Sequence, residues 1–127
     1  MKIIVLDDHP LILNFLQSEI HEIYPEAQVL LFNEINPTLY YIKKNVVDFV
    51  ICDLQIVSGK NLAVPNICYE RKIPFMVFSS HTNKIIYDQL KKLKVEMCYL
   101  ALKKLLKNYL LMRVILQLIL DMYLMRG

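Results

Sequence analysis

Glycine is scarce in this chain, with two Gly among 127 residues, and neither follows the first predicted strand. Domains that bind phosphate-bearing cofactors usually cradle the phosphate in a glycine-rich loop directly after that strand. Asp7 and Asp8 stand there instead, and their negative charge opposes phosphate binding. A small-molecule binder of that kind is therefore disfavoured.

Cysteine is also sparse, since the chain has three, Cys52, Cys68 and Cys98. An odd number of widely spaced cysteines fits neither a disulfide framework nor a zinc-binding pattern. We expect reduced, mostly buried thiols in a cytoplasmic protein.

Two further features are missing at the level of composition. The net charge is +3 and no basic block dominates, so composition does not argue for nucleic-acid binding. The first apolar run meets two aspartates after six residues, which is too short for a secretory signal peptide.

Apolar residues, in contrast, are abundant at 56% of the chain. Short β-prone runs predict strands at 2–6, 28–32, 48–52, 74–78 and 95–100. Helical periodicity, with Asp8 or His9 as the first cap, predicts helices at 10–24, 36–45, 62–71, 84–93 and from 101–103 almost to 127. Such alternation predicts an α/β fold with a doubly wound, five-stranded parallel sheet covered by helices on both faces.

Carboxylates follow two of these strands. Asp7 and Asp8 follow the first strand, and Asp53 follows the third, whose apolar run suits a strand buried on both faces. Ligands of parallel sheets bind beyond the carboxyl ends of the strands, so the three carboxylates are expected to meet there. Clustered carboxylates need a cation, and oxygen ligands suit Mg²⁺. Ser79 and a nearby lysine could bind the oxygens of a phosphoryl group.

Three segments together resemble one protein family. Residues 4–10 read Ile-Val-Leu-Asp-Asp-His-Pro, residues 48–56 read Asp-Phe-Val-Ile-Cys-Asp-Leu-Gln-Ile, and residues 74–80 read Pro-Phe-Met-Val-Phe-Ser-Ser. They resemble the receiver domain of two-component response regulators, most of all the LuxR/NarL-type subfamily. The resemblance covers residues 2–104 of a single domain, 1–127. It implies a CheY-like, flavodoxin-like (βα)5 fold, a three-layer sandwich.

The resemblance implies a role for each matching acidic position. Asp53 would be the phosphoacceptor, taking a phosphoryl group from a sensor histidine kinase. Asp8 and Asp53 would bind Mg²⁺ directly, Asp7 mainly through water, and the backbone carbonyl of Gln55 would be a further ligand. The chain would then be a signalling domain that assists its own phosphorylation and dephosphorylation, and not an enzyme.

Further positions follow from the same resemblance. Ser79 would bind a phosphoryl oxygen and carry the switch, with Tyr99 as its aromatic partner. Gln55 and His81 would tune dephosphorylation. Phosphorylation would then change the face formed by the fourth helix, the fifth strand and the last helix.

The chain departs from the family pattern at the phosphate-binding lysine. The family's fifth strand ends with a lysine directly after two apolar residues that follow Tyr. Here Leu102 stands at that position, so Lys103 is the predicted lysine and Lys104 the next choice. A degenerate receiver that works as a dimerisation or scaffold module without phosphorylation is therefore an alternative. A Mg²⁺-dependent phosphatase is disfavoured, because such enzymes usually place the nucleophile and the acid–base aspartate together after the first strand, whereas Asp53 stands alone after the third.

Residues 105–127 form an unusually apolar tail. Its polar residues Arg113, Gln117 and Asp121 are four apart and share one helical face. Charges in the centre disfavour a transmembrane helix, and we expect no membrane association. The broad apolar face predicts a homodimer through this region. A shifted reading frame from about Lys104 would also explain the change of composition, which the nucleotide sequence tests.

Regulators of this subfamily carry a helix-turn-helix domain after the receiver. No such segment follows in these 127 residues. DNA binding and the regulation of transcription are therefore expected only through an output domain outside this chain.

Overall fold

The structure is a computed structural model that describes residues 1–54, 56, 62–79, 88, 98–102 and 109–124. Its strands are β1 (Lys2–Leu6), β2 (Gln28–Phe32), β3 (Phe49–Cys52), β4 (Phe75–Ser79) and β5 (Cys98–Leu102). Its helices are α1 (Pro10–Ile23), α2 (Ile35–Lys44), α3 (Ala63–Glu70) and α5 (Tyr109–Leu124). The helix predicted at 84–93 lies, apart from Asp88, outside the described residues.

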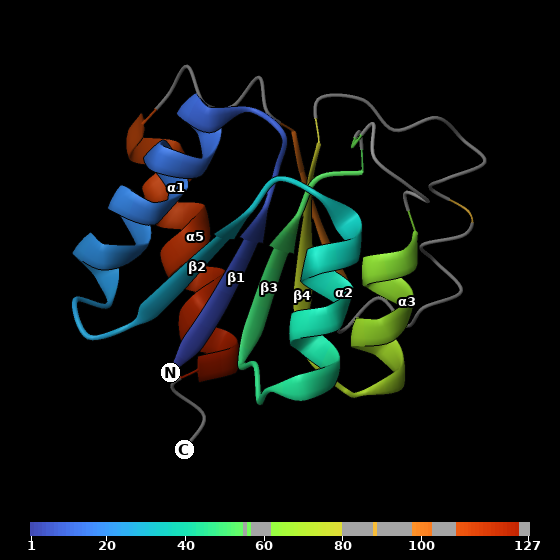
Figure 1. Cartoon of the computed structure of the whole chain (residues 1–127). Helices are drawn as coiled ribbons and strands as arrows, with labels where there is room; N and C mark the ends of the chain where they lie inside the picture. Colours follow the sequence, from blue (N-terminus) through green and yellow to red (C-terminus); the bar gives the residue numbers. More distant parts are fainter. Residues whose placement is uncertain (55, 57–61, 80–87, 89–97, 103–108, 125–127) are drawn as a thin grey trace.

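All five strands are parallel, in the order β2-β1-β3-β4-β5. Helices α1 and α5 cover one face of the sheet and α2 and α3 cover the other (Figure 1). The predicted fold class, a doubly wound five-stranded parallel sheet in three layers, is therefore confirmed.

Strand β3 shows why the apolar runs form the centre of the sheet. All four of its residues are buried. Val50 and Cys52 belong to the core under α2 and α3, whereas Phe49 and Ile51 belong to the core under α1 and α5. Successive side chains of a strand point to opposite faces, so a strand that is covered on both sides must be apolar throughout.

The prediction of the fifth strand was wrong at its end. Strand β5 covers Cys98–Leu102 and so runs past the predicted end at residue 100, while the predicted residues 95–97 lie outside the described residues. Ala101 and Leu102 continue the strand because they pair with Phe78 and Ser79 of β4. The last helix therefore does not begin at 101 or 102, and its first described residue is Tyr109.

The start of α1 differs from the prediction, because no side chain caps the helix by a hydrogen bond. His9 occupies the N-cap position but makes no side-chain capping bond. Its backbone N–H instead donates to Asp7 Oδ1 at 2.9 Å, and Pro10 opens the helix. The first carboxylate of the Asp-Asp pair thereby ties the end of β1 to the beginning of α1.

The apolar tail forms α5 and completes the second core. Leu116, Ile119 and Leu120 are buried with residues of β1, β3 and α1. Two residues of the polar face of α5 contact α1 and its C-cap residue: Arg113 pairs with Glu19, and Asp121 accepts a hydrogen bond from Tyr24. Over the described part of the chain, no helix is long and apolar enough to cross a membrane.

Two of the three cysteines are described with their side chains. Cys52 and Cys68 are both buried and form no disulfide, as expected of structural thiols. The side chain of Cys98 lies outside the described part of the structure.

Candidate functional site: a carboxylate cluster at the ends of β1 and β3

The pairing of β1 with β3 places Asp7 and Asp53 next to each other at the carboxyl edge of the sheet. Leu6 of β1 is in register with Cys52 of β3. One residue further, the Asp53 N–H donates to the Leu6 carbonyl at 2.9 Å, and the Asp7 N–H donates to the Phe32 carbonyl at 3.0 Å. These bonds prolong the sheet by one residue, so both side chains leave it at the carboxyl edge.

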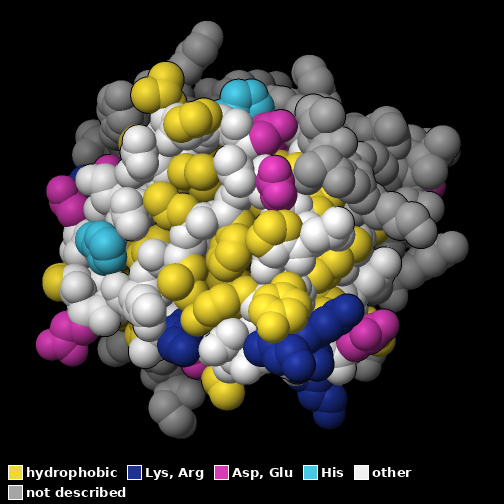
Figure 2. All heavy atoms as spheres, viewed as in Figure 1, with side chains coloured by type: hydrophobic (Ala, Val, Ile, Leu, Met, Phe, Trp, Pro, Cys, Tyr) yellow, Lys and Arg dark blue, Asp and Glu magenta, His cyan; other side chains and the backbone are white. Residues whose placement is uncertain are grey.

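Asp7, Asp8 and Asp53 form a carboxylate cluster at this edge, and His9 adjoins it. One ligand atom from each of the four residues lies within 4.8 Å of the others. Asp7 is 1% and Asp53 3% exposed, whereas the Asp8 side chain is 28% exposed. Figure 2 shows acidic side chains and a histidine gathered at the end of the molecule where β1 and β3 finish. The structure thus brings together the three carboxylates that the sequence placed at two separate strand ends.

The donor set fits a hard divalent cation. Asp8 Oδ1 is buried and has no hydrogen-bond partner among the described residues. It lies 3.0 Å from His9 Nδ1, but this contact is not a hydrogen bond. A buried carboxylate oxygen without a partner is costly, and three adjacent carboxylates repel one another. A cation with oxygen ligands, such as Mg²⁺, would relieve both costs.

His9 is the site residue that reasoning from the sequence missed, because it was considered only as a helix cap. Its ring Nδ1 lies 2.9 Å from Asp7 Oδ1, in addition to the backbone bond to the same oxygen. The sequence signal that could have identified His9 as a site residue was its position directly after Asp7 and Asp8.

The backbone of two other predicted site residues, Ser79 and Tyr99, is described in strands β4 and β5. Ser79 is the last residue of β4 and is paired with Leu102 of β5. Tyr99 lies within β5, paired with Met76. Their side chains are not described, and the switch roles predicted for them stay predictions.

Three predicted site residues fall outside the described part of the chain: Gln55, His81 and Lys103. The extension of β5 nevertheless bears on the lysine. Because β5 ends at Leu102, beside the end of β4, Lys103 directly follows the strand end nearest to Ser79. Lys103 stays the predicted phosphate-binding lysine.

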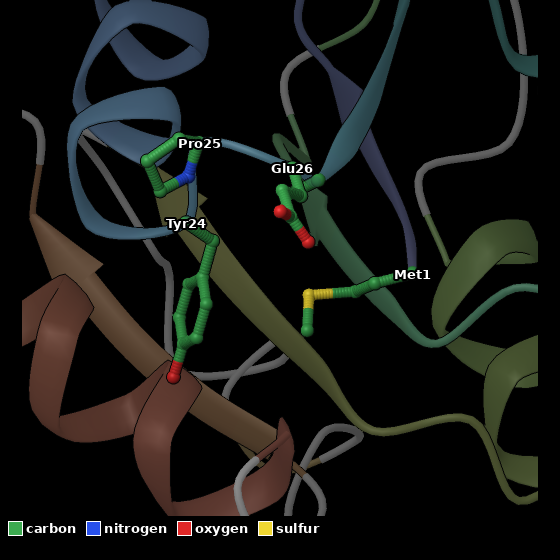
Figure 3. A pocket seen from close by; sticks show the side chains of 5 residues that line it. Met1, Tyr24, Pro25 and Glu26 are labelled. Atoms are coloured by element: carbon green, nitrogen blue, oxygen red, sulfur yellow. The ribbon is translucent and has the colours of Figure 1, made fainter.

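A pocket of about 360 Å³ lies at the opposite end of β1, where Met1 meets the connection between α1 and β2. Figure 3 shows Tyr24 extending towards α5, while Met1 and Glu26 face each other. Burial raises the pKa of Tyr24 to about 12, and the hydrogen bond and the charge of Asp121 add to this effect. The pocket is separated from the carboxylate cluster by the length of β1, so it contributes nothing to that site.

Comparison with solved structures identifies the fold. The signal receiver domain of the DNA-binding response regulator merR from Colwellia psychrerythraea is 16% identical, with a TM-score of 0.71 over 95% of this chain and 98% of that chain. The isolated receiver domain of RcsB from Salmonella enterica, solved with the phosphomimetic BeF₃⁻, is 20% identical, with a TM-score of 0.69 over 82% of this chain and 78% of that chain. The chain therefore has the fold of response regulator receiver domains.

A third similar structure contains two RcsB dimers bound to two parallel DNAs. It is 19% identical, with a TM-score of 0.72, and the match covers 91% of this chain but 58% of that one. No family model and no curated protein matches this chain.

Proposed function

We propose that this chain is a response regulator receiver domain, in which Asp53 accepts a phosphoryl group from a sensor histidine kinase. The observation that carries the proposal is the carboxylate cluster itself. Asp53 lies beside Asp7 and Asp8 at the carboxyl ends of two neighbouring parallel strands, in a receiver fold. A signalling domain of this kind would work in the cytoplasm.

The proposed step is a phosphoryl transfer to a carboxylate. An oxygen of Asp53 attacks the phosphorus of a phosphohistidine, the new P–O bond forms and the P–N bond breaks. The electron pair leaves with the imidazole of the kinase, which takes up a proton. Asp8, Asp53 and the backbone carbonyl of Gln55 would hold Mg²⁺ directly and Asp7 mainly through water. The ion would offset the charge on the phosphoryl oxygens.

Other predicted residues would act around this centre. Ser79 and Lys103 would bind phosphoryl oxygens after the transfer, as hydroxyl and ammonium groups can. Tyr99 would respond to Ser79, and Gln55 and His81 would set the rate of dephosphorylation. The new charge would bias the face formed by residues 84–93, β5 and α5 between two states.

Incubation with acetyl phosphate and Mg²⁺, followed by intact mass measurement, tests the proposal. We expect one added phosphoryl group on the wild-type chain and none on Asp53→Asn. Asp48→Asn is the matched control, since Asp48 lies just before the other end of β3, where it accepts a bond from the Lys2 N–H. That variant should be labelled like the wild type. Equal labelling of Asp53→Asn would contradict the proposal.

A degenerate receiver is the second candidate, and the displaced lysine favours it. Leu102 occupies the strand position at which the family pattern has lysine. If the wild-type chain gains no mass where an ordinary receiver is labelled, the scaffold function replaces the signalling one.

We also propose that the chain forms a homodimer through α5. Val114, Leu118 and Met122 are exposed apolar residues four apart on this helix, which places them in one stripe. A second copy of the chain would bury this stripe. RcsB, which has the same fold, was solved as dimers bound to DNA, and this supports a dimeric state for this chain. Transcription would be regulated through an output domain outside this chain.

A further inference from the structure

His9 adjoins the carboxylate cluster but has no role in the proposed phosphoryl transfer. Its Nδ1 lies 2.9 Å from Asp7 Oδ1 and 3.0 Å from Asp8 Oδ1. The same nitrogen belongs to the set of four ligand atoms, with Asp53, that all lie within 4.8 Å. The imidazole therefore faces the same point as the three carboxylates.

The spacing of these atoms is that of neighbouring ligands around one cation. Two ligands at right angles, each bonded at about 2.1 Å, are separated by about 3.0 Å. A hydrogen bond explains the contact of His9 Nδ1 with Asp7 when Nδ1 carries the proton, and the nitrogen can bind a cation in the tautomer that carries it on Nε2. A hydrogen bond does not explain the contact with Asp8. Asp8 Oδ1 is buried without a hydrogen bond, although the nitrogen lies at contact distance. That oxygen and the nitrogen are both placed for a shared cation.

The backbone of His9 is held more firmly than a surface histidine would be. Its N–H donates to Asp7 Oδ1, and its carbonyl accepts bonds from the N–H groups of Ile12 and Leu13 in the first turn of α1. The side chain itself is 59% exposed, so the ring can adjust to an incoming ion from solvent. A fixed backbone with an adjustable ring suits a ligand at the open side of a site.

We infer that His9 is a nitrogen ligand of the cation held by Asp7, Asp8 and Asp53, and that it raises the affinity of this site for cations that favour imidazole, such as Co²⁺, Ni²⁺ and Zn²⁺, over Mg²⁺. Imidazole suits these borderline metals, whereas carboxylate and water suit Mg²⁺. The inference rests on the proposed function, because the same carboxylates hold the cation in both.

Titration calorimetry on the full chain, with Co²⁺ and Mg²⁺ as separate probes, tests the role of His9. His9→Gln should weaken Co²⁺ binding by about 10-fold or more, the loss typical of removing one metal-site interaction. Mg²⁺ binding should change by less than about 3-fold, because its oxygen ligands remain. The visible spectrum of bound Co²⁺ should also change, since an oxygen or water replaces the nitrogen.

Two further variants make the result specific. His9→Asn removes the imidazole but adds a favoured N-cap residue, so α1 keeps its start. His21→Gln is the matched control, because His21 Nε2 contacts the Ala27 carbonyl at the other end of α1. It should leave both affinities unchanged.

The outcomes separate the inference from the proposed function. If Mg²⁺ binds and Asp53→Asn abolishes the binding, but His9→Gln leaves Co²⁺ affinity and the Co²⁺ spectrum as in the wild type, the role of His9 is wrong and the proposed site stands. If neither cation binds the wild-type chain, both are wrong. A selective loss of Co²⁺ affinity in both His9 variants establishes the nitrogen ligand.

Discussion

Two members of the carboxylate cluster, Asp7 and Asp53, are almost completely buried side by side, at 1% and 3% exposure. Both side chains are removed from water, and the repulsion between two neighbouring carboxylates costs free energy. The fold thus carries a local strain that a bound cation would relieve. We therefore expect the cluster to lower the free energy of unfolding of the chain without a bound cation.

Asp53→Asn tests this cost at a single residue. In buffer with EDTA, the variant should gain about 1 kcal/mol in free energy of unfolding, because one buried charge is removed. Mg²⁺ should raise the melting temperature of the wild type and not of the variant, since only the native wild-type chain binds it. Thermal unfolding by circular dichroism measures both effects. A variant less stable than the wild type in EDTA would contradict the argument, and Asp48→Asn is the control for loss of charge elsewhere on β3.

Tyr24 gives the stability of the fold a dependence on alkaline pH. Its pKa is raised to about 12 in the folded chain, above the value near 10 of an unfolded chain. The folded state therefore holds this proton more tightly. The resulting stabilisation is complete below about pH 10 and is lost as the pH rises through about 12.

Tyr24→Phe should accordingly show a shallower loss of unfolding free energy between about pH 10 and 12 than the wild type. Denaturant titrations at several pH values measure this slope. Asp121→Asn should lower the pKa of Tyr24, which a tyrosine titration by ultraviolet absorbance detects. Tyr40→Phe is the control, because Tyr40 is exposed on α2 and its loss leaves the Tyr24–Asp121 pair intact. Identical slopes for the wild type and Tyr24→Phe would contradict the assignment.

At the scale of elements, α5 has three different faces. Leu116 and Leu120 are buried against the sheet, Arg113 and Asp121 bind α1, and Leu118 is exposed. The many apolar residues of the tail therefore lie on two faces of α5, one buried against the sheet and one exposed. Two of the polar residues that interrupt the tail, Arg113 and Asp121, have partners at Glu19 and Tyr24.

Leu120→Ala and Leu118→Ala separate the docked face of α5 from the exposed one. Leu120 is completely buried, so its truncation should cost about 2–5 kcal/mol of unfolding free energy. Leu118 is 63% exposed, and its truncation should cost less than about 0.5 kcal/mol. Denaturant unfolding of the two variants measures the difference. Equal costs would contradict the docking of α5 on the sheet.

At the scale of the whole molecule, the two ends of the sheet have different properties. The carboxyl ends of β1 and β3 carry the carboxylate cluster, while the opposite end carries a pocket lined by Met1, Pro25 and Ala27, among others. The exposed stripe of α5 lies on neither of these sites. Chemistry and association are thus placed on separate surfaces of one domain.

Leu118→Glu tests association through that stripe. The substitution adds a charge to the exposed face without entering the core, so the monomer should keep its fold. Sedimentation velocity over a range of concentrations should show a dimer for the wild type and a monomer for the variant, since like charges would meet across a two-fold interface. Tyr40→Glu, on α2, is the control and should dimerise. A wild type that stays monomeric would exclude the proposed dimer.

The local pattern of the sequence was sufficient to predict the order and type of the described elements. It was also sufficient to predict that Asp53 directly follows a buried strand. Burial on both faces requires a continuous apolar run, and a parallel sheet collects its polar strand ends at one edge. The first rule acts over a few neighbouring residues, so it can be applied to β1 and β3 from the sequence alone. The second rule applies once the two strands pair in the sheet.

Contacts between distant residues were decided only by the tertiary structure. Arg113 and Glu19 are 94 positions apart, and Tyr24 and Asp121 are 97 apart, so no local pattern pairs them. Strand β5 extends to Leu102 because β4 offers it partners as far as Ser79. The turn between β1 and α1 places the His9 side chain next to Asp7 and Asp8. The register of β1 with β3 places it near Asp53. Periodicity sets which face of an element is buried, but only packing determines which side chains meet there.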